Sequence, residues 1–340
     1  MQQRIFYFDL LRCIAAVAVV AIHVLGPYRH LLGDAPMGHW LSAVTVNSAI
    51  RWAVPIFIMI TGALLLSDQR TFNLRYYMQR RVLKVVVPFV VWSLFFAVIA
   101  SYSLKDGFSS RALLEKVSAF YNQETYYHLG FFYYFIPLYF VAPFLTHLAR
   151  HAAAHAPLTA LLVVWIITTT LNLFFIDGVW SNDLWLFSGY LILGYWLFKQ
   201  ESVSTSSVLL MGTLAIMAMA CNAYQVITLS LEAEQYRVGR WLSYKTINTV
   251  IEAAALFLLV RYFAPKLSDK AKRLVSFVSR HSLGIYLMHP LMLLPLYQWQ
   301  WYQGNHPLWV IPLWTSIGFF GALWMSWVLS RSSFTRWLVP

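Results

Sequence analysis

Charged residues are scarce in this chain. They make up 11% of its 340 residues, whereas hydrophobic residues make up 60%. Because soluble globular chains carry about 25% charged residues and about half apolar residues, the composition excludes a soluble enzyme, a disordered chain and a fibrous repeat. Cysteine is also rare, and Cys13 and Cys221 both lie in apolar runs. The sequence therefore offers neither a disulfide framework nor a cysteine-based zinc site, and we expect no metal.

Long apolar runs recur along the chain, and most approach the roughly 20 residues that a helix needs to cross a bilayer. We predict an all-α polytopic membrane helix bundle of about ten transmembrane helices. Residues 1–340 are expected to form a single integral membrane domain without a separate soluble domain, and the longest loop, 105–128, to hold a short interfacial helix. The predicted spans are residues 5–28, 43–66, 82–104, 129–149, 157–176, 183–198, 207–229, 242–263, 277–298 and 307–329.

Lysine and arginine are distributed unevenly between the loops. The termini and the loops on their side of the membrane carry 16 of the 25, the opposite loops carry 7, and Arg12 and Arg51 lie inside spans. By the positive-inside rule, both termini are cytoplasmic. The net charge of +12 then reflects topology in a lipid bilayer. We expect no nucleic-acid partner, because no loop interleaves aromatic and basic residues as a single-strand binder would.

Ionisable residues inside apolar spans are costly, and they usually face a cavity, a partner or a substrate. The first span contains Asp9, Arg12 and His23. His23 follows Arg12 by eleven positions, which places both on one helix face about 16 Å apart, while Asp9 is close enough to pair with Arg12. We therefore predict one helix stripe with a cation near the cytoplasm and a titratable base near the outer leaflet.

Arg51 is the ionisable residue of the second span, and Pro55 follows it by one turn. A buried arginine at this depth needs a carboxylate, backbone carbonyls or a substrate. Pro55 lacks an N–H and frees a carbonyl near position 51, which supplies one partner without any ligand. Both interpretations, a locally satisfied arginine and a substrate-binding arginine, therefore remain open for Arg51.

Polar residues also mark the fourth, eighth and ninth spans. Ser282, Tyr286 and His289 fall at positions i, i+4 and i+7, so they share one helix face. His128 opens the fourth span, where a lone histidine equally often caps a helix. Glu252 lies near the middle of the eighth span, four residues after Asn248. The groups that converge if their helices are neighbours are His23, Arg51, His128 and His289.

Two basic clusters lie on the predicted cytoplasmic side. They indicate either ordinary topology with lipid head-group contact, or a site for a polyanionic ligand such as a nucleotide-bearing cofactor, whose phosphates suit arginine forks. Arg80, Arg81 and Lys84 are the candidate cofactor-binding residues. The clusters are Arg70, Arg75, Arg80, Arg81 and Lys84, and Arg261, Lys266, Lys270, Lys272, Arg273 and Arg280.

Three motifs in this order resemble the acyltransferase 3 family of membrane-bound acyltransferases, and the resemblance spans the whole chain. The first is Arg12 and His23 with FDLLR at 8–12, the second is RWAVPIF at 51–57 followed by Gly62, and the third is SLGIYLMHP at 282–290. Within the family the chain is similar to the group of the enterobacterial common antigen O-acetyltransferase, through Asn47-Ser48, YHL at 127–129 and RHSLGIY at 280–286.

The resemblance implies a multi-pass O-acetyltransferase of the bacterial cytoplasmic (inner) membrane. It would move an acetyl group from cytoplasmic acetyl-CoA to a hydroxyl of a cell-envelope sugar or polysaccharide. The implied catalytic residues are His23, Arg12 and Arg51, with His23 as the base or acetyl carrier. The implied substrate-binding residues are His128, Ser282, Tyr286 and His289.

Two departures and two rival functions accompany this interpretation. Gly130 stands where relatives usually have tryptophan, which affects the expected shape of the acceptor site, and Glu252 belongs to no motif of the family. The rivals are a proton-coupled transporter or flippase of an envelope glycan precursor, and a catalytically inactive scaffold. The sequence shows no internal repeat, which weighs against a transporter built from two related halves. It indicates no particular oligomeric state.

Overall fold

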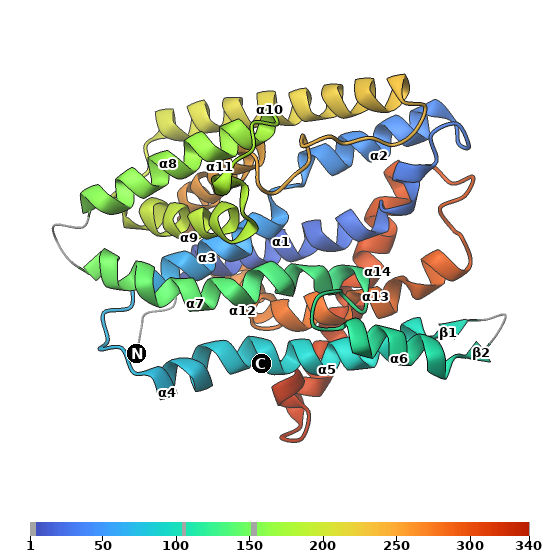
Figure 1. Ribbon diagram of the computed structural model, residues 1–340, viewed down its shortest axis with the longest axis horizontal. Helices are drawn as coiled ribbons and strands as arrows, with labels where there is room; N and C mark the ends of the chain where they lie inside the picture. The colour runs from blue at the N-terminus through green and yellow to red at the C-terminus, as the bar shows by residue number, and fades with distance from the viewer. Residues whose placement is uncertain (1–4, 104–106, 151–154, 340) are drawn as a thin grey trace.

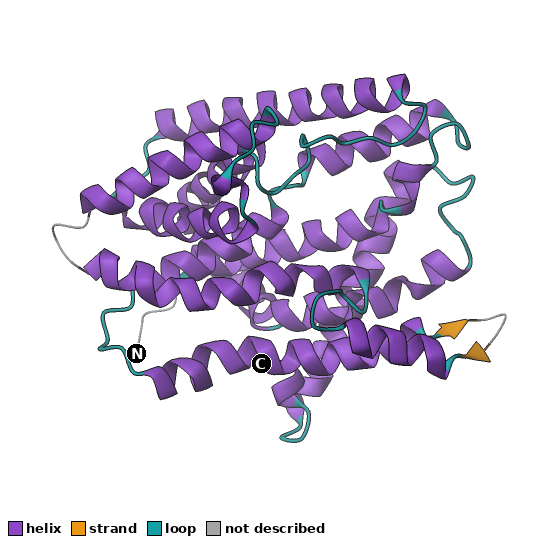
Figure 2. Ribbon diagram, in the orientation of Figure 1, coloured by secondary structure: helices purple, strands orange, loops and turns teal. Residues whose placement is uncertain are grey.

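The chain is described by a computed structural model over residues 5–103, 107–150 and 155–339. These residues are mostly helical, with one short hairpin of β1 (Tyr102–Ser103) and β2 (Gly107–Phe108), as Figure 2 shows. The predicted all-α bundle is confirmed. Its helices are α1 (Phe6–Val24), α2 (Met37–Ala49), α3 (Ala53–Leu66), α4 (Leu74–Tyr77), α5 (Leu83–Ala100), α6 (Ser110–Ala119), α7 (Gly130–Arg150), α8 (His155–Leu173), α9 (Asp183–Lys199), α10 (Thr205–Glu232), α11 (Ile247–Phe263), α12 (Asp269–Arg280), α13 (Ser282–Gln298) and α14 (Pro307–Arg331).

Eight helical segments of the described residues are long and apolar enough to cross a membrane. The sixth and ninth predicted spans correspond to α9 and α13, which have 17 residues each and are largely buried in the bundle. The loops fall at opposite ends of the bundle in Figure 1, with 31–36 and 299–306 at one end and 67–73 at the other. The count of ten spans and the cytoplasmic termini stay predictions. The helix expected in the loop 105–128 is present as α6.

The second predicted span, 43–66, is not one continuous helix, and this corrects the expectation from its apolar pattern. α2 ends at Ala49 and α3 begins at Ala53, so Arg51 lies in the turn between them. Pro55 falls in the first turn of α3, where backbone N–H groups have no partner within the helix and a missing N–H costs nothing. The proline therefore permits the break, and the break carries Arg51.

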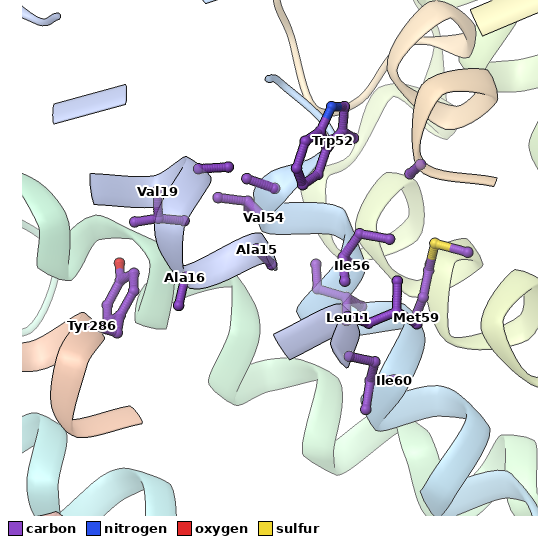
Figure 3. Close-up of a cluster of buried hydrophobic side chains, with 14 of the residues drawn as sticks. Leu11, Ala15, Ala16, Val19, Trp52, Val54, Ile56, Met59, Ile60 and Tyr286 are labelled. Atoms are coloured by element: carbon purple, nitrogen blue, oxygen red, sulfur yellow. The ribbon is translucent and has the colours of Figure 1, made fainter. Parts of the chain in front are cut away.

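α1 occupies the centre of the bundle and contacts α3, α11, α12, α13 and α14. Figure 3 shows its buried face, where Leu11 and Ala15 lie beside Ile56 of α3 and Ala16 lies near Tyr286 of α13. Leu11, Ala15 and Ile56 are fully buried. Small residues at 15 and 16 let neighbouring backbones approach closely, which is how helices associate when lipid removes the hydrophobic driving force.

Candidate functional site

Three histidines from distant parts of the chain meet at one end of α1. The ring of His23, in the last turn of α1, stacks on the ring of His289 from α13, with 5.1 Å between centroids and 26° between planes. His128, in the short turn that precedes α7, lies with its ring 5.5 Å from that of His289. The structure thus brings together the three predicted histidines, which we call the histidine cluster.

Backbone carbonyls orient the two buried members of the histidine cluster. His289 Nδ1 lies 2.7 Å from the carbonyl oxygen of Tyr286, and His128 Nε2 lies 3.2 Å from that of Leu287. Because carbonyls only accept hydrogen bonds, these nitrogens carry the protons. The lone pairs then reside on His289 Nε2 and His128 Nδ1, neither of which has a hydrogen-bond partner among the described residues. Both rings therefore present acceptors, as neutral binding groups or bases do.

His23 is the reachable member of the histidine cluster. His128 and His289 are 2% and 0% exposed, whereas His23 is half-buried. Its ring lies 4.7 Å from the ring of Tyr127, which is 40% exposed. The hydroxyl of Tyr297 donates to the His23 backbone carbonyl over 2.6 Å and so fixes the end of α1. A molecule that approaches along Tyr127 would meet His23 first.

Arg51 is held by the loop between α10 and α11 (residues 233–246). Its Nε donates to the carbonyl of Leu242 over 2.8 Å, and its guanidinium carbon lies 4.2 Å from the ring centre of Tyr244. Both partners belong to this loop, so the carbonyl that binds Arg51 is not the one freed by Pro55. The structure brings the three histidines together and joins Arg51 to this loop instead.

The predicted pairing within the first span is confirmed. Arg12 lies 3.5 Å from Asp9, whose carboxylate also accepts hydrogen bonds from the hydroxyls of Ser276 and Ser279 on α12. α12 is a separate helix that ends at Arg280, so the ninth predicted span begins later than expected, with α13 at Ser282. Asp9 thereby fixes both the Arg12 side chain and the position of α12 against α1.

Arg12 opens onto a cavity of about 200 Å³, which we call the Arg12 cavity. Most of its lining is apolar or aromatic, from α3, α5, α7 and α13, and Arg12 is the charged residue in it. Ser282 and Tyr286 also line it, whereas His289, the third residue of their predicted helix face, does not. The Tyr286 hydroxyl donates to the His128 carbonyl, so Tyr286 borders both the Arg12 cavity and the histidine cluster.

A second cavity, of about 210 Å³, lies where α3, α4 and α7 end or begin, and we call it the basic cavity. It is lined by Arg70, Arg81, His147 and Arg150, together with Asp68. Asp68 binds Arg70 and lies 3.6 Å from Arg81. The hydrogen bond from Arg70 lowers the pKa of Asp68 below its usual value, so Asp68 is a carboxylate at neutral pH.

The two cavities are neighbours. Tyr77 lines the basic cavity, and its hydroxyl donates over 2.7 Å to the carbonyl of Tyr139, which lines the Arg12 cavity. The basic cavity, the Arg12 cavity and the histidine cluster therefore follow one another, with this tyrosine pair between the first two and Tyr286 between the last two.

Of the three predicted cofactor-binding residues, one lines a cavity and two do not. Arg81 lines the basic cavity, whereas Arg80 and Lys84 are exposed and line neither cavity, so their role stays a prediction. Sequence reasoning missed His147 and Arg150 as site residues. They come from the end of α7, about eighty positions after Asp68, and no local motif links them to the loop after α3.

A search of the described residues finds no group of three His, Cys, Asp or Glu side chains that could hold a metal ion. A family model described as an acyltransferase domain matches residues 5–331 of the chain. No curated protein and no solved structure matches it.

Proposed function

The chain belongs to the acyltransferase 3 family and is a multi-pass membrane protein, and on that premise we propose that it is an O-acetyltransferase of the bacterial inner membrane. It would move an acetyl group from cytoplasmic acetyl-CoA to a hydroxyl of a cell-envelope sugar or polysaccharide, as relatives in the enterobacterial common antigen group do. The observation that supports this proposal best is the succession of the basic cavity, the neighbouring Arg12 cavity and the histidine cluster, linked by Tyr77, Tyr139 and Tyr286.

The two parts of the donor would match the two cavities. The phosphates of acetyl-CoA would occupy the basic cavity, where Arg70, Arg81 and Arg150 supply planar fork donors. The pantetheine arm would pass Tyr77 and Tyr139 into the apolar Arg12 cavity, which carries the thioester toward Tyr286. Arg12, about 16 Å from His23 along α1, would orient the donor arm as it passes, and Arg51 would stabilise negative charge on the thioester oxygen.

The acceptor would approach the histidine cluster from the other side. As the sugar oxygen attacks the thioester carbonyl, His23 takes the hydroxyl proton; the carbon–sulfur bond then breaks and the CoA thiolate leaves. Exposed Tyr127 offers a face for the sugar beside His23, whereas His128 and His289 are buried and would bind its other hydroxyls only once the histidine cluster opens. A β-carbon at Gly130 would lie 3.6 Å from the Glu124 carboxyl carbon, an ordinary van der Waals contact, so the backbone there would accept a side chain.

The proposal is tested with purified protein in nanodiscs by measuring CoA release from acetyl-CoA with and without an envelope glycan, and acetyl groups on the glycan. Acceptor-dependent release that matches glycan acetylation supports it. A burst of CoA release without acceptor indicates an acetyl-histidine relay, and its absence in active protein indicates direct transfer. If the protein neither binds nor consumes acetyl-CoA and instead moves a glycan precursor unchanged across the membrane, the transporter function replaces this one.

Arg81→Ala should raise the KM for acetyl-CoA about tenfold with little change in kcat, since a charge-assisted phosphate contact contributes about 1.5 to 3 kcal/mol. Lys84→Ala is the matched control, because Lys84 lies one turn away and is exposed outside both cavities. Initial rates over a range of donor concentrations give both constants. An equal rise in KM for the two variants would contradict the placement of the phosphates in the basic cavity.

Asp68→Asn should tighten acetyl-CoA binding several-fold, in the opposite direction to the arginine variants. Asp68 binds Arg70 and lies near Arg81, so its carboxylate competes with the donor phosphates for the same cations. Asparagine keeps the shape and removes that competition. Isothermal calorimetry with CoA measures the change, and weaker binding by Asp68→Asn would show that Asp68 organises the arginines instead of competing for them.

A further inference from the structure

Glu252 is a buried carboxyl that the proposed reaction does not use. It lies in α11, is 1% exposed, and accepts a hydrogen bond from the side-chain amide of Asn222 on α10 over 2.8 Å. Its second oxygen, Oε2, has no hydrogen-bond partner among the described residues. A carboxyl inside an apolar span is costly, so its presence requires a function that an apolar side chain cannot supply.

The hydrogen bonds that start at Glu252 continue in one direction. Because the Asn222 amide nitrogen donates to Glu252, its oxygen faces Asn248 and accepts from the Asn248 amide over 2.5 Å. The same Asn248 nitrogen donates to the backbone carbonyl of Trp241. Asn222 and Asn248 are 0% and 5% exposed. The acceptor at Glu252 thus sets the orientation of both asparagine amides, and the second amide ends on the 233–246 loop.

These hydrogen bonds end on the part of the 233–246 loop that holds Arg51. Trp241 directly precedes Leu242, whose carbonyl accepts from Arg51 Nε. Two positions after Leu242 is Tyr244, whose ring lies under the guanidinium. We infer that Glu252 is a positioning residue: through Asn222 and Asn248 its carboxyl fixes the loop that holds Arg51. The role is exerted on Arg51, and Glu252 itself touches neither substrate.

The inference rests on the proposed function only for its effect on rate. In the proposed reaction Arg51 stabilises charge on the thioester oxygen, so a displaced guanidinium changes the field where the acetyl group is transferred. The loop also has contacts that do not involve Glu252, such as the hydrogen bond from the Tyr190 hydroxyl to the Tyr244 carbonyl at 2.8 Å. We therefore expect a change in the position of Arg51 rather than loss of the fold.

The kinetic test uses Glu252→Leu, which removes the acceptor, and Glu252→Gln, which retains one acceptor oxygen. Glu252→Leu should lower kcat by about 10- to 100-fold, the cost of a small misplacement near reacting groups. The donor KM should stay unchanged, because Glu252 lines neither cavity. Glu252→Gln should restore most of the rate. In an Arg51→Ala background, Glu252→Leu should have no further effect, since the two residues act as a unit.

Three kinetic results would each overturn the inference. In the first, Glu252→Leu lowers kcat by the same factor in the Arg51→Ala background as in the wild type. In the second, Glu252→Gln has a kcat as low as that of Glu252→Leu, and in the third, Glu252→Leu changes only the KM for the donor.

A second measurement does not depend on activity. Hydrogen exchange of the amides at 238–246 should become faster in Glu252→Leu and in Asn222→Leu, and stay unchanged in Glu232→Gln, an exposed glutamate on α10. Unchanged exchange in both leucine variants overturns the inference. A wild type that releases no CoA overturns only the proposed function.

Discussion

His23→Ala should lower the rate of acetyl transfer about 10³-fold while acetyl-CoA still binds, because removal of a positioned general base typically costs 10²- to 10⁴-fold. His23 is the least buried member of the histidine cluster, and its ring stacks directly on that of His289. The donor cavities do not include His23, so donor affinity should be retained. Single-turnover CoA release together with calorimetric CoA binding separates the two effects.

His30→Ala is the matched control for this experiment. His30 lies seven positions later, is exposed, and lies 5.5 Å from the ring of Tyr236 instead of in the histidine cluster. Its removal should leave the rate within about twofold, as surface substitutions usually do. If His23→Ala retained more than a tenth of the wild-type rate while His30→Ala did the same, the base would have to lie elsewhere, with His289 as the next residue to replace.

Gly194→Val should prevent the bundle from folding, with a loss of at least about 3 kcal/mol in the free energy of unfolding. α3 and α9 pack so closely that a β-carbon at Gly194 would lie 2.0 Å from the Met59 carbonyl oxygen. A β-carbon at Gly62 on the facing helix would lie 2.2 Å from the Leu191 carbonyl oxygen. Both obstacles are backbone, which no rotamer change relieves, so the helices would have to separate.

Gly212→Ala provides the control, because no heavy atom lies within 4 Å of the β-carbon position on α10. It should leave stability unchanged or raise it by up to about 1 kcal/mol, since alanine favours helix more than glycine does. Folded yield on gel filtration and thermal unfolding in detergent measure both variants. A well-folded Gly194→Val protein with wild-type melting would contradict the close α3–α9 contact.

Several parts of the site followed from the sequence because they depend on short-range geometry. The pairing of Asp9 with Arg12 and the shared face of Ser282 and Tyr286 come from helical periodicity, which a stretch of sequence displays. Pro55 was a partial sign in the sequence of the break between α2 and α3 at Arg51. The long second apolar run pointed to one continuous helix, because two short helices joined by a turn have the same average hydrophobicity as one long helix.

Other parts had no signal that one sequence could display. Asn222 interrupts an apolar run, which marks it as unusual, yet its partners Glu252 and Asn248 lie on another helix. His147 and Arg150 look like ordinary residues at a helix end until α7 packs beside the loop after α3. These contacts join residues tens of positions apart, and only the packing of specific helix pairs decides which of them form.

The sequence by itself determined the all-α membrane bundle, the stripe on the first helix and the family, since composition, periodicity and motif order are properties of the chain alone. The tertiary structure decided that His23, His128 and His289 meet, that Arg51 is held by the 233–246 loop, and that the basic cavity and the Arg12 cavity are neighbours. The physical reason is that lipid-exposed helices gain little from hydrophobicity when they choose partners. Close glycine contacts and buried hydrogen bonds select the pairs, and these depend on atoms brought together in space.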